Sequence, residues 1–371
     1  MISSKGEGVV QTLMVGLGER SYPIRIGSGI LASLGHHLRD ALHARRYAVI
    51  SDNHVAALYG GQVLQALQAA ELEGELFTFS AGEASKNLAN IEQLASSMAQ
   101  QGFDRGDAIL ALGGGVSGDM AGFLAAIYMR GIPFAQVPTS LLAQVDSSVG
   151  GKTGVDIPEG KNLIGAFYQP RLVLIDTDVL QTLPRSELLA GMGEVIKYGA
   201  SLDADFFTYL DQHREQILAL NPAVLSSVIS HCCALKARVV EQDEREGGWR
   251  RVLNFGHTIG HAVEAASDYS LLHGFAVAIG MCAVADLAAR CGYASAQVKE
   301  EIAALLRAYG LPTAVPQALD RERIATFMQA DKKSIGRRLF FVLPTALGQV
   351  KITDEVDPAA LAQVLAGHDA A

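Results

Sequence analysis

Three histidines of the chain lie close together in the sequence: His257, His261 and His273. The first two are four residues apart, so on a helix their imidazole rings share one face. Imidazole and carboxylate ligands are typical of a catalytic zinc-type site that keeps one position open for substrate, and Glu194 lies beside Lys197 on an earlier predicted helix. A lone histidine is more often structural. Three within seventeen residues, of ten in the chain, favour a metal site.

A glycine-rich stretch, Gly113-Gly-Gly-Val-Ser-Gly-Asp119, follows an apolar run and opens a helical pattern. Such glycines let a phosphate approach the backbone, and the helix N-terminus offers free N–H groups. The spacing differs from G-x-G-x-x-G, so a plain strand-to-helix turn is the alternative. Because Gly82-Glu-Ala-Ser-Lys86 ends a neighbouring strand in a similar way, we favour a dinucleotide. Asp52, at the end of the first strand of this series, is a candidate for the ribose hydroxyl.

The lysines indicate an anion site. The chain has only ten, and seven of them lie in the stretches that carry these motifs. Lys152 and Lys161 belong to two glycine-rich segments, 146–156 and 160–165, which together form a cationic, backbone-accessible surface. The segments lack the spacing of an ATP-binding P-loop. The alternatives are a flexible surface loop and a chance cluster of solvated lysines. Arg250, Arg251 and the run 331–333 read as solvated faces on pattern alone.

The elements that must position these residues follow two different sequence patterns. Up to about residue 185, apolar strands alternate with helical patterns, which predicts a mostly parallel, Rossmann-like sheet covered by helices. Beyond it the chain is Ala- and Leu-rich with three-to-four-residue spacing, which predicts helices and one hairpin near 339–353. We therefore expect an α/β domain that carries the dinucleotide candidates over 1–185 and a mainly α-helical domain that carries the metal candidates over 186–371. The predicted strands are 47–51, 75–79, 108–112, 134–137 and 172–175, and the predicted helices are 55–70, 88–101, 186–199, 203–219, 222–242, 252–267, 274–291 and 296–308.

Composition narrows the class of protein. A length of 371 residues fits two domains. The net charge of −9 argues against nucleic acid as a partner, and the longest uninterrupted apolar stretch, about 276–285, is too short to span a bilayer. The first ten residues lack the order of a signal peptide, and four cysteines form no disulfide framework. We expect a cytoplasmic protein with no membrane partner.

Taken together, the motifs resemble the 3-dehydroquinate synthase family of sugar-phosphate cyclases over about 49–347. Single motifs are weak evidence, but their order and spacing are specific. They are Gly82-Glu-Ala-Ser-Lys86, Gly113–Asp119, Met129-Arg-Gly-Ile132, Pro138-Thr-Ser140, Asp146–Lys152, Gly160–Phe167, Gly193-Glu-Val-Ile-Lys-Tyr-Gly199, Asn254–His261 and Asp331-Lys-Lys333.

The resemblance implies three sets of site residues. NAD would be bound by Asp52, Glu83, Lys86, Gly114, Gly115, Val116, Asp119, Thr139, Ser140, Lys152, Lys161 and Thr182. A divalent metal, zinc or cobalt, would be held by Glu194, His257 and His273. Substrate would be contacted by Arg130, Asp146, Lys152, Asn162, Lys197, Lys236, Arg250, Asn254, His261 and one of Lys332 or Lys333, with Lys333 the first choice. His261 thus moves from the metal, where helix spacing alone would put it, to the substrate.

The implied reaction converts 3-deoxy-D-arabino-heptulosonate 7-phosphate to 3-dehydroquinate and phosphate, a step of the shikimate pathway. NAD would take and later return a hydride, and phosphate elimination, ring opening and an intramolecular aldol closure would complete the conversion. The family implies a homodimer. The alternatives are a cyclase acting on sedoheptulose 7-phosphate, a metal-dependent polyol dehydrogenase of the glycerol dehydrogenase type, and an inactive nucleotide-binding module.

Three positions depart from the family pattern. Phe275 stands where Glu usually follows His273-Gly274, Asp156 where Asn is expected, and Tyr168 where His is common. If the usual Glu orients the metal site, Phe275 puts metal affinity in doubt.

Overall fold

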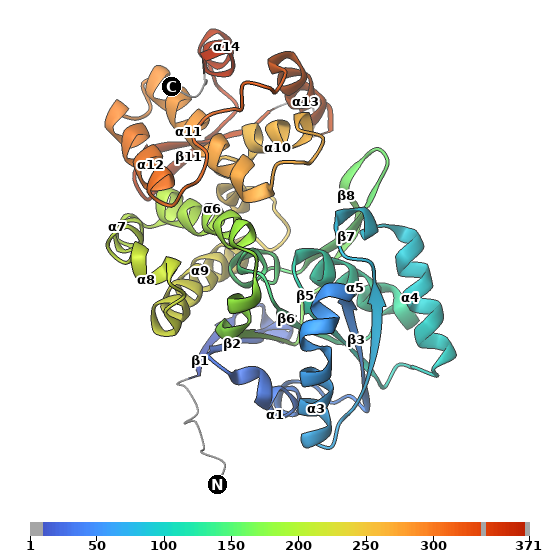
Figure 1. Ribbon diagram of the computed structural model, residues 1–371. Coiled ribbons are helices and arrows are strands. Elements are labelled where there is room, and N and C mark those ends of the chain that lie inside the picture. Colours follow the sequence, from blue (N-terminus) through green and yellow to red (C-terminus); the bar gives the residue numbers. More distant parts are fainter. Residues whose placement is uncertain (1–9, 335–338, 368–371) are drawn as a thin grey trace. The chain divides into compact units, whose positions relative to one another are not determined.

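The computed structural model describes residues 10–334 and 339–367, with side chains described for 10–328 and 339–367. By internal packing the chain separates into two compact units (Figure 1). Unit 1 contains the described residues up to Leu183 together with Leu220–Arg245, and unit 2 contains Pro184–Ala219 and the described residues from Glu246 onward.

Unit 1 is built on a seven-stranded sheet in the order β1-β2-β9-β6-β5-β3-β4. Every pairing in it is parallel except that of β1 with β2. A separate antiparallel hairpin is formed by β7 and β8. The strands are β1 (Gln11–Val15), β2 (Tyr22–Gly27), β3 (Arg46–Asp52), β4 (Glu73–Phe79), β5 (Ala108–Gly113), β6 (Phe134–Pro138), β7 (Lys152–Ile157), β8 (Gly160–Phe167) and β9 (Leu172–Asp176). The helices are α1 (Leu34–Ala41), α2 (Asn53–Val55), α3 (Gly61–Ala69), α4 (Leu88–Gln100), α5 (Gly115–Ile127) and α9 (Pro222–Gln242).

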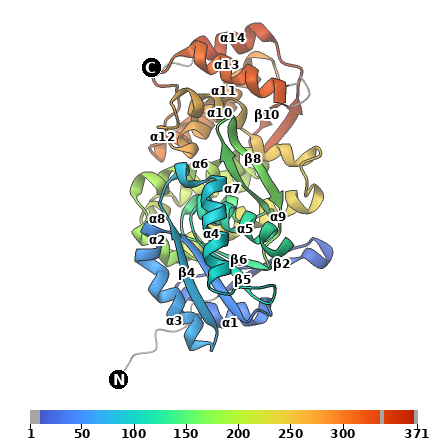
Figure 2. The same cartoon turned by 90° about the vertical axis from the view of Figure 1, so that its right-hand side faces the viewer.

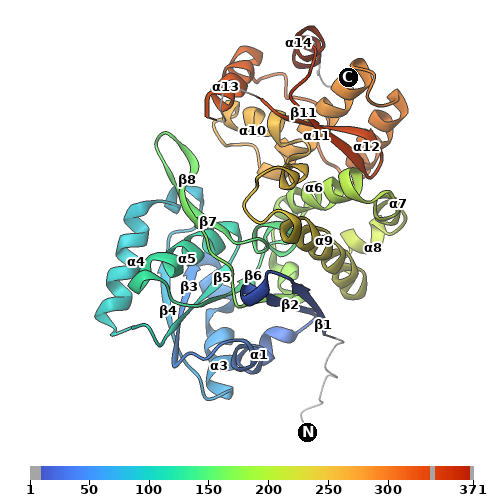
Figure 3. The ribbon, with the colours of Figure 1, turned by 180° about the vertical axis from the view of Figure 1, so that it is seen from behind.

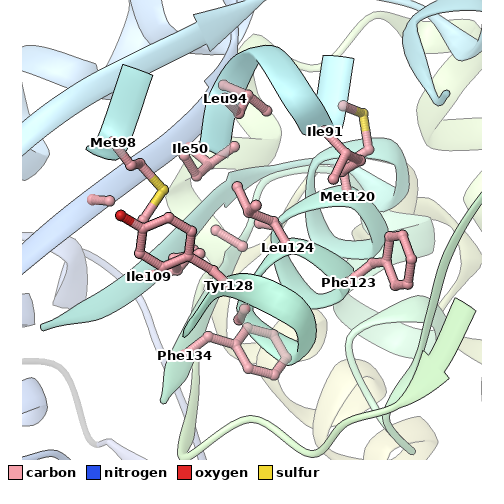
Figure 4. Close-up of a cluster of buried hydrophobic side chains, with 14 of the residues drawn as sticks. Ile50, Ile91, Leu94, Met98, Ile109, Met120, Phe123, Leu124, Tyr128 and Phe134 are labelled. Carbon is pink, nitrogen blue, oxygen red and sulfur yellow. The ribbon is translucent and has the colours of Figure 1, made fainter. Parts of the chain in front are cut away.

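The central strands are apolar on both faces because both faces are covered by helices. Along β3, Tyr47 and Val49 point into one core, and Ala48 and Ile50 point into the other. The first core contains residues of α1 and α3, and the second contains residues of α4 and α5. Figure 4 shows the second core, with Ile50 among the labelled side chains of α4 and α5, and in the view of Figure 2 α4 lies in front of the sheet. All five predicted strands are present as β3, β4, β5, β6 and β9.

Unit 2 is mainly helical, as expected. Its helices are α6 (Arg185–Leu202), α7 (Ala204–Gln212), α8 (Arg214–Leu218), α10 (His257–Ala266), α11 (His273–Arg290), α12 (Ala296–Ala308), α13 (Arg321–Ser334) and α14 (Pro358–Gly367). The predicted hairpin is β10 (Phe341–Ala346) with β11 (Gln349–Thr353). Helix α11 is central: it packs against α6, α10 and α12 (Figure 3).

The structure divides the chain differently from the sequence prediction at one segment. Helix α9, which we placed in the second domain, packs against β1 and β2 and therefore belongs to unit 1. The sequence prediction had no strands at β1 and β2, so it lacked the two strands against which α9 packs. The predicted helix 203–219 is two helices that meet at His213, and 252–267 is a 3₁₀ turn (Trp249–Asn254) followed by α10.

Two helices, α9 and α11, are long and apolar enough to cross a membrane when judged by length and composition. In the structure 56% and 78% of their apolar windows are buried, as is usual for helices that form a protein core. Apolar character at this length is therefore weak evidence for a membrane span here.

Candidate functional site

The expected nucleotide site lies at the carboxyl edge of the parallel sheet in unit 1. Strand β5 ends at Gly113, whose φ of +149° lies outside the range that other residues readily adopt. A Cβ at Gly113 would lie 2.3 Å from Ser117 Oγ, so the turn into α5 needs a glycine. Thr139, just after β6, donates its N–H to Gly113 O at 2.9 Å, which places it and Ser140 at the same edge. The N-terminal N–H groups of α5, at Gly115 and Val116, therefore face an edge suited to a phosphate.

Asp52 ends β3 at this edge. Its Oδ1 accepts the N–H groups of His54 and Val55 at 2.9 and 3.0 Å, and its Oδ2 lies 3.5 Å from Ser117 Oγ. It is thus the N-cap of α2, a role the sequence prediction missed. Thr182, the last residue expected to touch NAD, exchanges a hydrogen bond of 2.6 Å with the Tyr59 hydroxyl.

Lys86 is a buried cation that joins three segments of unit 1. Its Nζ lies 2.6 Å from Asp119 Oδ2, 2.5 Å from Asn162 Oδ1 and 4.0 Å from Glu83 Oε1. Burial works against the charged amine, but the neighbouring carboxylates outweigh it and raise the pKa of Lys86. Lys161 Nζ lies 3.8 Å from the same Glu83 carboxylate. Five of the residues predicted for NAD or substrate therefore form one connected cluster.

The segments that carry Lys152 and Lys161 form an antiparallel hairpin, where the sequence prediction had no strands. Glycines obscure the strand pattern because they sit where the two strands approach most closely. A Cβ at Gly154 would lie 2.6 Å from Ile164 O, and one at Gly165 would lie 2.1 Å from Thr153 O. Lys152 is exposed at the start of β7.

Asp156, one of the departures from the family, fixes this hairpin to Lys86. Its N–H donates to Lys86 O at 2.8 Å, and its Oδ1 accepts the N–H of Asn162 at 2.7 Å. Asn162 has a φ of +56°, a left-handed conformation that asparagine tolerates better than most residues. The carboxylate at position 156 therefore accepts a hydrogen bond from a backbone N–H group.

Two further residues, both predicted to bind substrate, are in contact with each other in unit 1. Lys236, on α9, donates from Nζ to Asp146 Oδ1 at 2.7 Å and to Asp146 O at 2.8 Å. Helix α9 therefore contributes a side chain to the candidate site of unit 1 in addition to packing against its sheet. Arg130 is exposed at the end of a short turn, and Met129, Arg130 and Gly131 all have positive φ.

In unit 2, the expected metal ligands converge from three helices. Glu194 on α6 is fully buried, and its Oε1 lies 3.4 Å from His257 Nε2 on α10 and 3.3 Å from His273 Nε2 on α11. Donors on a tetrahedral zinc, with bonds of about 2.0–2.2 Å, lie about 3.4 Å apart. The observed spacings match this value, so the donor set fits one such ion. His261 lies beside them: His257, His261 and His273 each offer a nitrogen within 4.8 Å of the others.

Both expected ligand rings are held through their second nitrogen. His257 Nδ1 lies 3.1 Å from Phe255 O, and His273 Nδ1 lies 3.0 Å from Glu264 Oε2. Burial lowers the pKa of His257 to about 3. Burial acts in the same direction on His273, but two carboxylates outweigh it and raise its pKa to about 10.

The remaining predicted residues of unit 2 have varied surroundings. Lys197 Nζ lies 2.6 Å from Glu194 Oε2 and is almost completely buried. Arg250 is only 2% exposed, so the interpretation of it as solvated is wrong, whereas Arg251 stacks over the Phe340 ring. Asn254 Nδ2 lies 3.3 Å from Glu246 Oε1. The side chains of Lys332 and Lys333 lie outside the described residues.

Sequence reasoning missed two carboxylates. Glu264 contacts a predicted ligand, and Glu246 contacts a predicted substrate residue. Helix spacing could have indicated Glu264, since it follows His257 by seven residues and His261 by three, on the same face. Glu246 lies in an irregular segment, where no periodicity was available.

The two units together define a class of protein. It combines a Rossmann-like unit that has a strand-to-helix turn suited to phosphate with a helical unit that has a Glu–His–His centre.

Comparison with known proteins narrows this class to one family. Residues 76–190 match the family model described as 3-dehydroquinate synthase N-terminal, and residues 191–334 match its C-terminal counterpart. The chain is 49% identical to the 3-dehydroquinate synthase of Desulforamulus reducens, over 95% of this chain and 99% of that one, and 48% identical to that of Acidithiobacillus ferrooxidans over 96% and 98%. It belongs to the 3-dehydroquinate synthase family.

Solved structures also resemble this chain over nearly its whole length. A 2-deoxy-scyllo-inosose synthase complexed with carbaglucose-6-phosphate, NAD⁺ and Co²⁺ has a TM-score of 0.88 at 28% identity, covering 96% of this chain and 99% of that one. The 2-epi-5-epi-valiolone synthase of Streptomyces hygroscopicus, with NAD⁺ and Zn²⁺ bound, has a TM-score of 0.87 at 29% identity, covering 95% and 99%. A glycerol dehydrogenase of Schizosaccharomyces pombe, at 17% identity over 93% of this chain and 88% of that one (TM-score 0.65), shares the fold alone.

Proposed function

We infer that the chain is a 3-dehydroquinate synthase, which converts 3-deoxy-D-arabino-heptulosonate 7-phosphate to 3-dehydroquinate and phosphate. The observation that carries this inference is the Glu194–His257–His273 donor set, whose spacings fit one tetrahedral metal, in a chain 46–49% identical to 3-dehydroquinate synthases along nearly its whole length. NAD and a divalent metal are its cofactors. When bound, NAD⁺ accepts and returns a hydride, and the metal acts as a Lewis acid on an oxygen of the substrate.

Within unit 1, we assign NAD to the turn at Gly113–Asp119 and to the residues around Lys86. The turn fits a dinucleotide because a helix N-terminus and a backbone without side chains face the same edge. The other proposed contacts are Asp52, Glu83, Thr139, Ser140, Lys152, Lys161 and Thr182. Arg130, Lys152 and Asn162 offer donors for phosphate, and Lys236 is held by Asp146 as a cation for an anionic substrate.

Within unit 2, we assign the metal to Glu194, His257 and His273, and the substrate to Lys197, Arg250, Asn254, His261 and Lys333. His261 has an imidazole beside the donor set, where it can accept or give up a proton. Lys197 is a buried cation beside Glu194, so it can stabilise negative charge that develops on a bound oxygen. We also propose that unit 1 and unit 2 are the NAD-binding and metal-binding domains.

Phosphate release tests this function. The substrate is supplied with NAD⁺ far below its own concentration, and phosphate and NADH absorbance are followed before and after treatment with EDTA. We expect phosphate far in excess of NAD⁺, no net NADH and loss of activity on chelation. Net NADH from a simple polyol would instead indicate a dehydrogenase. Phosphate from sedoheptulose 7-phosphate alone would indicate another cyclase.

Three further properties are proposals: that the chain forms a homodimer, that it is cytoplasmic, and that it takes neither nucleic acid nor membrane as partner. Light scattering coupled to size exclusion tests the first of these. A mass equal to one chain would overturn it.

A further inference from the structure

The carboxylate of Glu264 contacts the proposed metal ligand His273 through the ring nitrogen that does not face Glu194. It lies on α10, is only 7% exposed, and its Oε2 is 3.0 Å from His273 Nδ1 on α11. The other nitrogen of that ring, Nε2, lies 3.3 Å from Glu194 Oε1. The ring of His273 is therefore held between two carboxylates, one on each nitrogen.

The chemistry of this contact fixes the tautomer of His273. An ionised carboxylate only accepts hydrogen bonds, so Nδ1 must carry the proton and donate it. When a cation displaces the proton from Nε2, that nitrogen offers its lone pair to the metal, while Nδ1–H remains hydrogen-bonded to Glu264. His257 is fixed in the same sense by the carbonyl of Phe255 at 3.1 Å, but a neutral carbonyl supplies a weaker acceptor.

The packing of α10 on α11 allows Glu264 to reach this position. A Cβ at Gly280 would lie 1.9 Å from Gly256 O, and one at Gly260 would lie 2.9 Å from Ala276 O. These glycines let the two backbones approach closely, which brings a side chain of α10 against a ring on α11.

Position 275 does not supply this carboxylate. It carries Phe275, and residues two apart on a helix point in different directions, so a side chain there faces away from that of His273. The departure from the family at position 275 therefore leaves the contact between Glu264 and His273 intact.

We propose that Glu264 is a positioning residue of the metal centre: it holds His273 in the tautomer and orientation that bind a divalent cation, and thereby sets the affinity for that cation. This proposal rests on the proposed function and deepens it. Outer carboxylates of this kind typically account for a factor of about 10–100 in metal affinity.

The test is a titration of metal-stripped full-length protein with Co²⁺, followed by d–d absorption and by competition with a chelator. Glu264→Gln keeps an acceptor oxygen but loses the charge, and we expect affinity about tenfold weaker. Glu264→Ala removes the acceptor, and we expect a loss of about 10–100-fold with an altered d–d spectrum. Glu300→Gln, an exposed charge change on α12, and Phe275→Glu should both stay within about twofold of the parent.

The outcomes separate the two levels of inference. If the parent chain binds no Co²⁺, the proposed metal centre fails, and this proposal fails with it. If the parent binds Co²⁺ and Glu264→Gln matches it in both affinity and spectrum, the role of Glu264 is overturned while the function stands. A weakened affinity in Glu264→Gln with an unchanged melting temperature in the metal-free protein supports the proposal, because a general loss of structure would lower both. Glu264→Gln therefore decides the matter even if Glu264→Ala does not fold.

Discussion

The two units build their candidate sites in different ways. In unit 1 the proposed phosphate turn is made by the main chain: Gly113 at the end of β5, a helix N-terminus at Gly115, and Thr139 just after β6. In unit 2 the centre is made by side chains from α6, α10 and α11, with Glu194 between His257 and His273. The proposed phosphate turn of unit 1 depends on where side chains are missing, and the centre of unit 2 depends on which side chains are present.

This difference teaches that the two sites should fail separately. A main-chain site is damaged by added atoms, whereas a side-chain site is damaged by removed ones. For a variant in one unit, binding of the other unit's ligand, NAD or metal, should be unchanged and serves as an internal control.

The largest expected effect comes from removing a proposed metal ligand. His257→Ala deletes one of three donors, and we expect metal content and kcat/KM to fall by more than about 100-fold. NAD binding by unit 1, measured by fluorescence titration, should be unchanged. His213→Ala, in the same unit but stacked on Tyr209, is the matched control and should retain its metal. Full metal content in His257→Ala would contradict the assignment.

The opposite variant adds a single carbon to the turn of unit 1. In Gly114→Ala the new Cβ would lie 3.4 Å from Ser140 Oγ, and the backbone there is extended, so the fold should persist. The methyl group occupies space that a phosphate needs, and we expect NAD affinity to fall about tenfold. Metal content should not change. Gly61→Ala, where a Cβ meets nothing within 4 Å, should bind NAD normally. Equal NAD affinities in both variants would place the cofactor elsewhere.

A smaller effect tests the hairpin of unit 1, where a side chain holds a main-chain group. Asp156→Ala removes the acceptor for the N–H of Asn162, and we expect kcat/KM to fall about fivefold, equivalent to about 1 kcal/mol. Asp156→Asn keeps an acceptor oxygen and should stay within about twofold. Steady-state kinetics on the phosphate-release assay measures both. A loss of equal size in the two variants would show that the charge, and not the acceptor, matters.

The smallest effect concerns Asp286, which lies on α11 with His273 but is not among the proposed site residues. Burial would raise its pKa, but hydrogen bonds from Lys299 and Arg290 outweigh burial and hold the pKa below its usual value. A depressed carboxyl pKa stabilises the fold above the unfolded-state value of about 4 and loses this contribution as pH falls through the folded value. We expect Asp286→Asn to lower the free energy of unfolding by about 0.5–1 kcal/mol at pH 7 and by much less near pH 3.

Urea unfolding at the two pH values measures this difference. Glu92→Gln, an exposed change beyond the first turn of α4, is its control. A constant difference across pH would mean that the ion pairs are not its source.

Much of the fold followed from local pattern. Buried strands such as β3 and β5 have apolar residues on both faces, and long amphipathic or apolar helices such as α9 and α12 begin and end at or near the expected residues. Patterns failed where glycines replaced the periodic residues, as in the β7–β8 hairpin, and at β1 and β2, where buried and more exposed residues alternate instead of forming one buried apolar run.

The sequence by itself determined the chemistry that is available: histidines and a glutamate at helical spacings, lysines among glycines, and a strand-to-helix turn without side chains. These are local properties, because residue type and spacing fix them. Only the tertiary structure decided which groups meet. It brought Glu264 to His273, Asp156 to Asn162, Asp146 to Lys236 and α9 onto the sheet of unit 1, since each of these contacts depends on how separate elements pack.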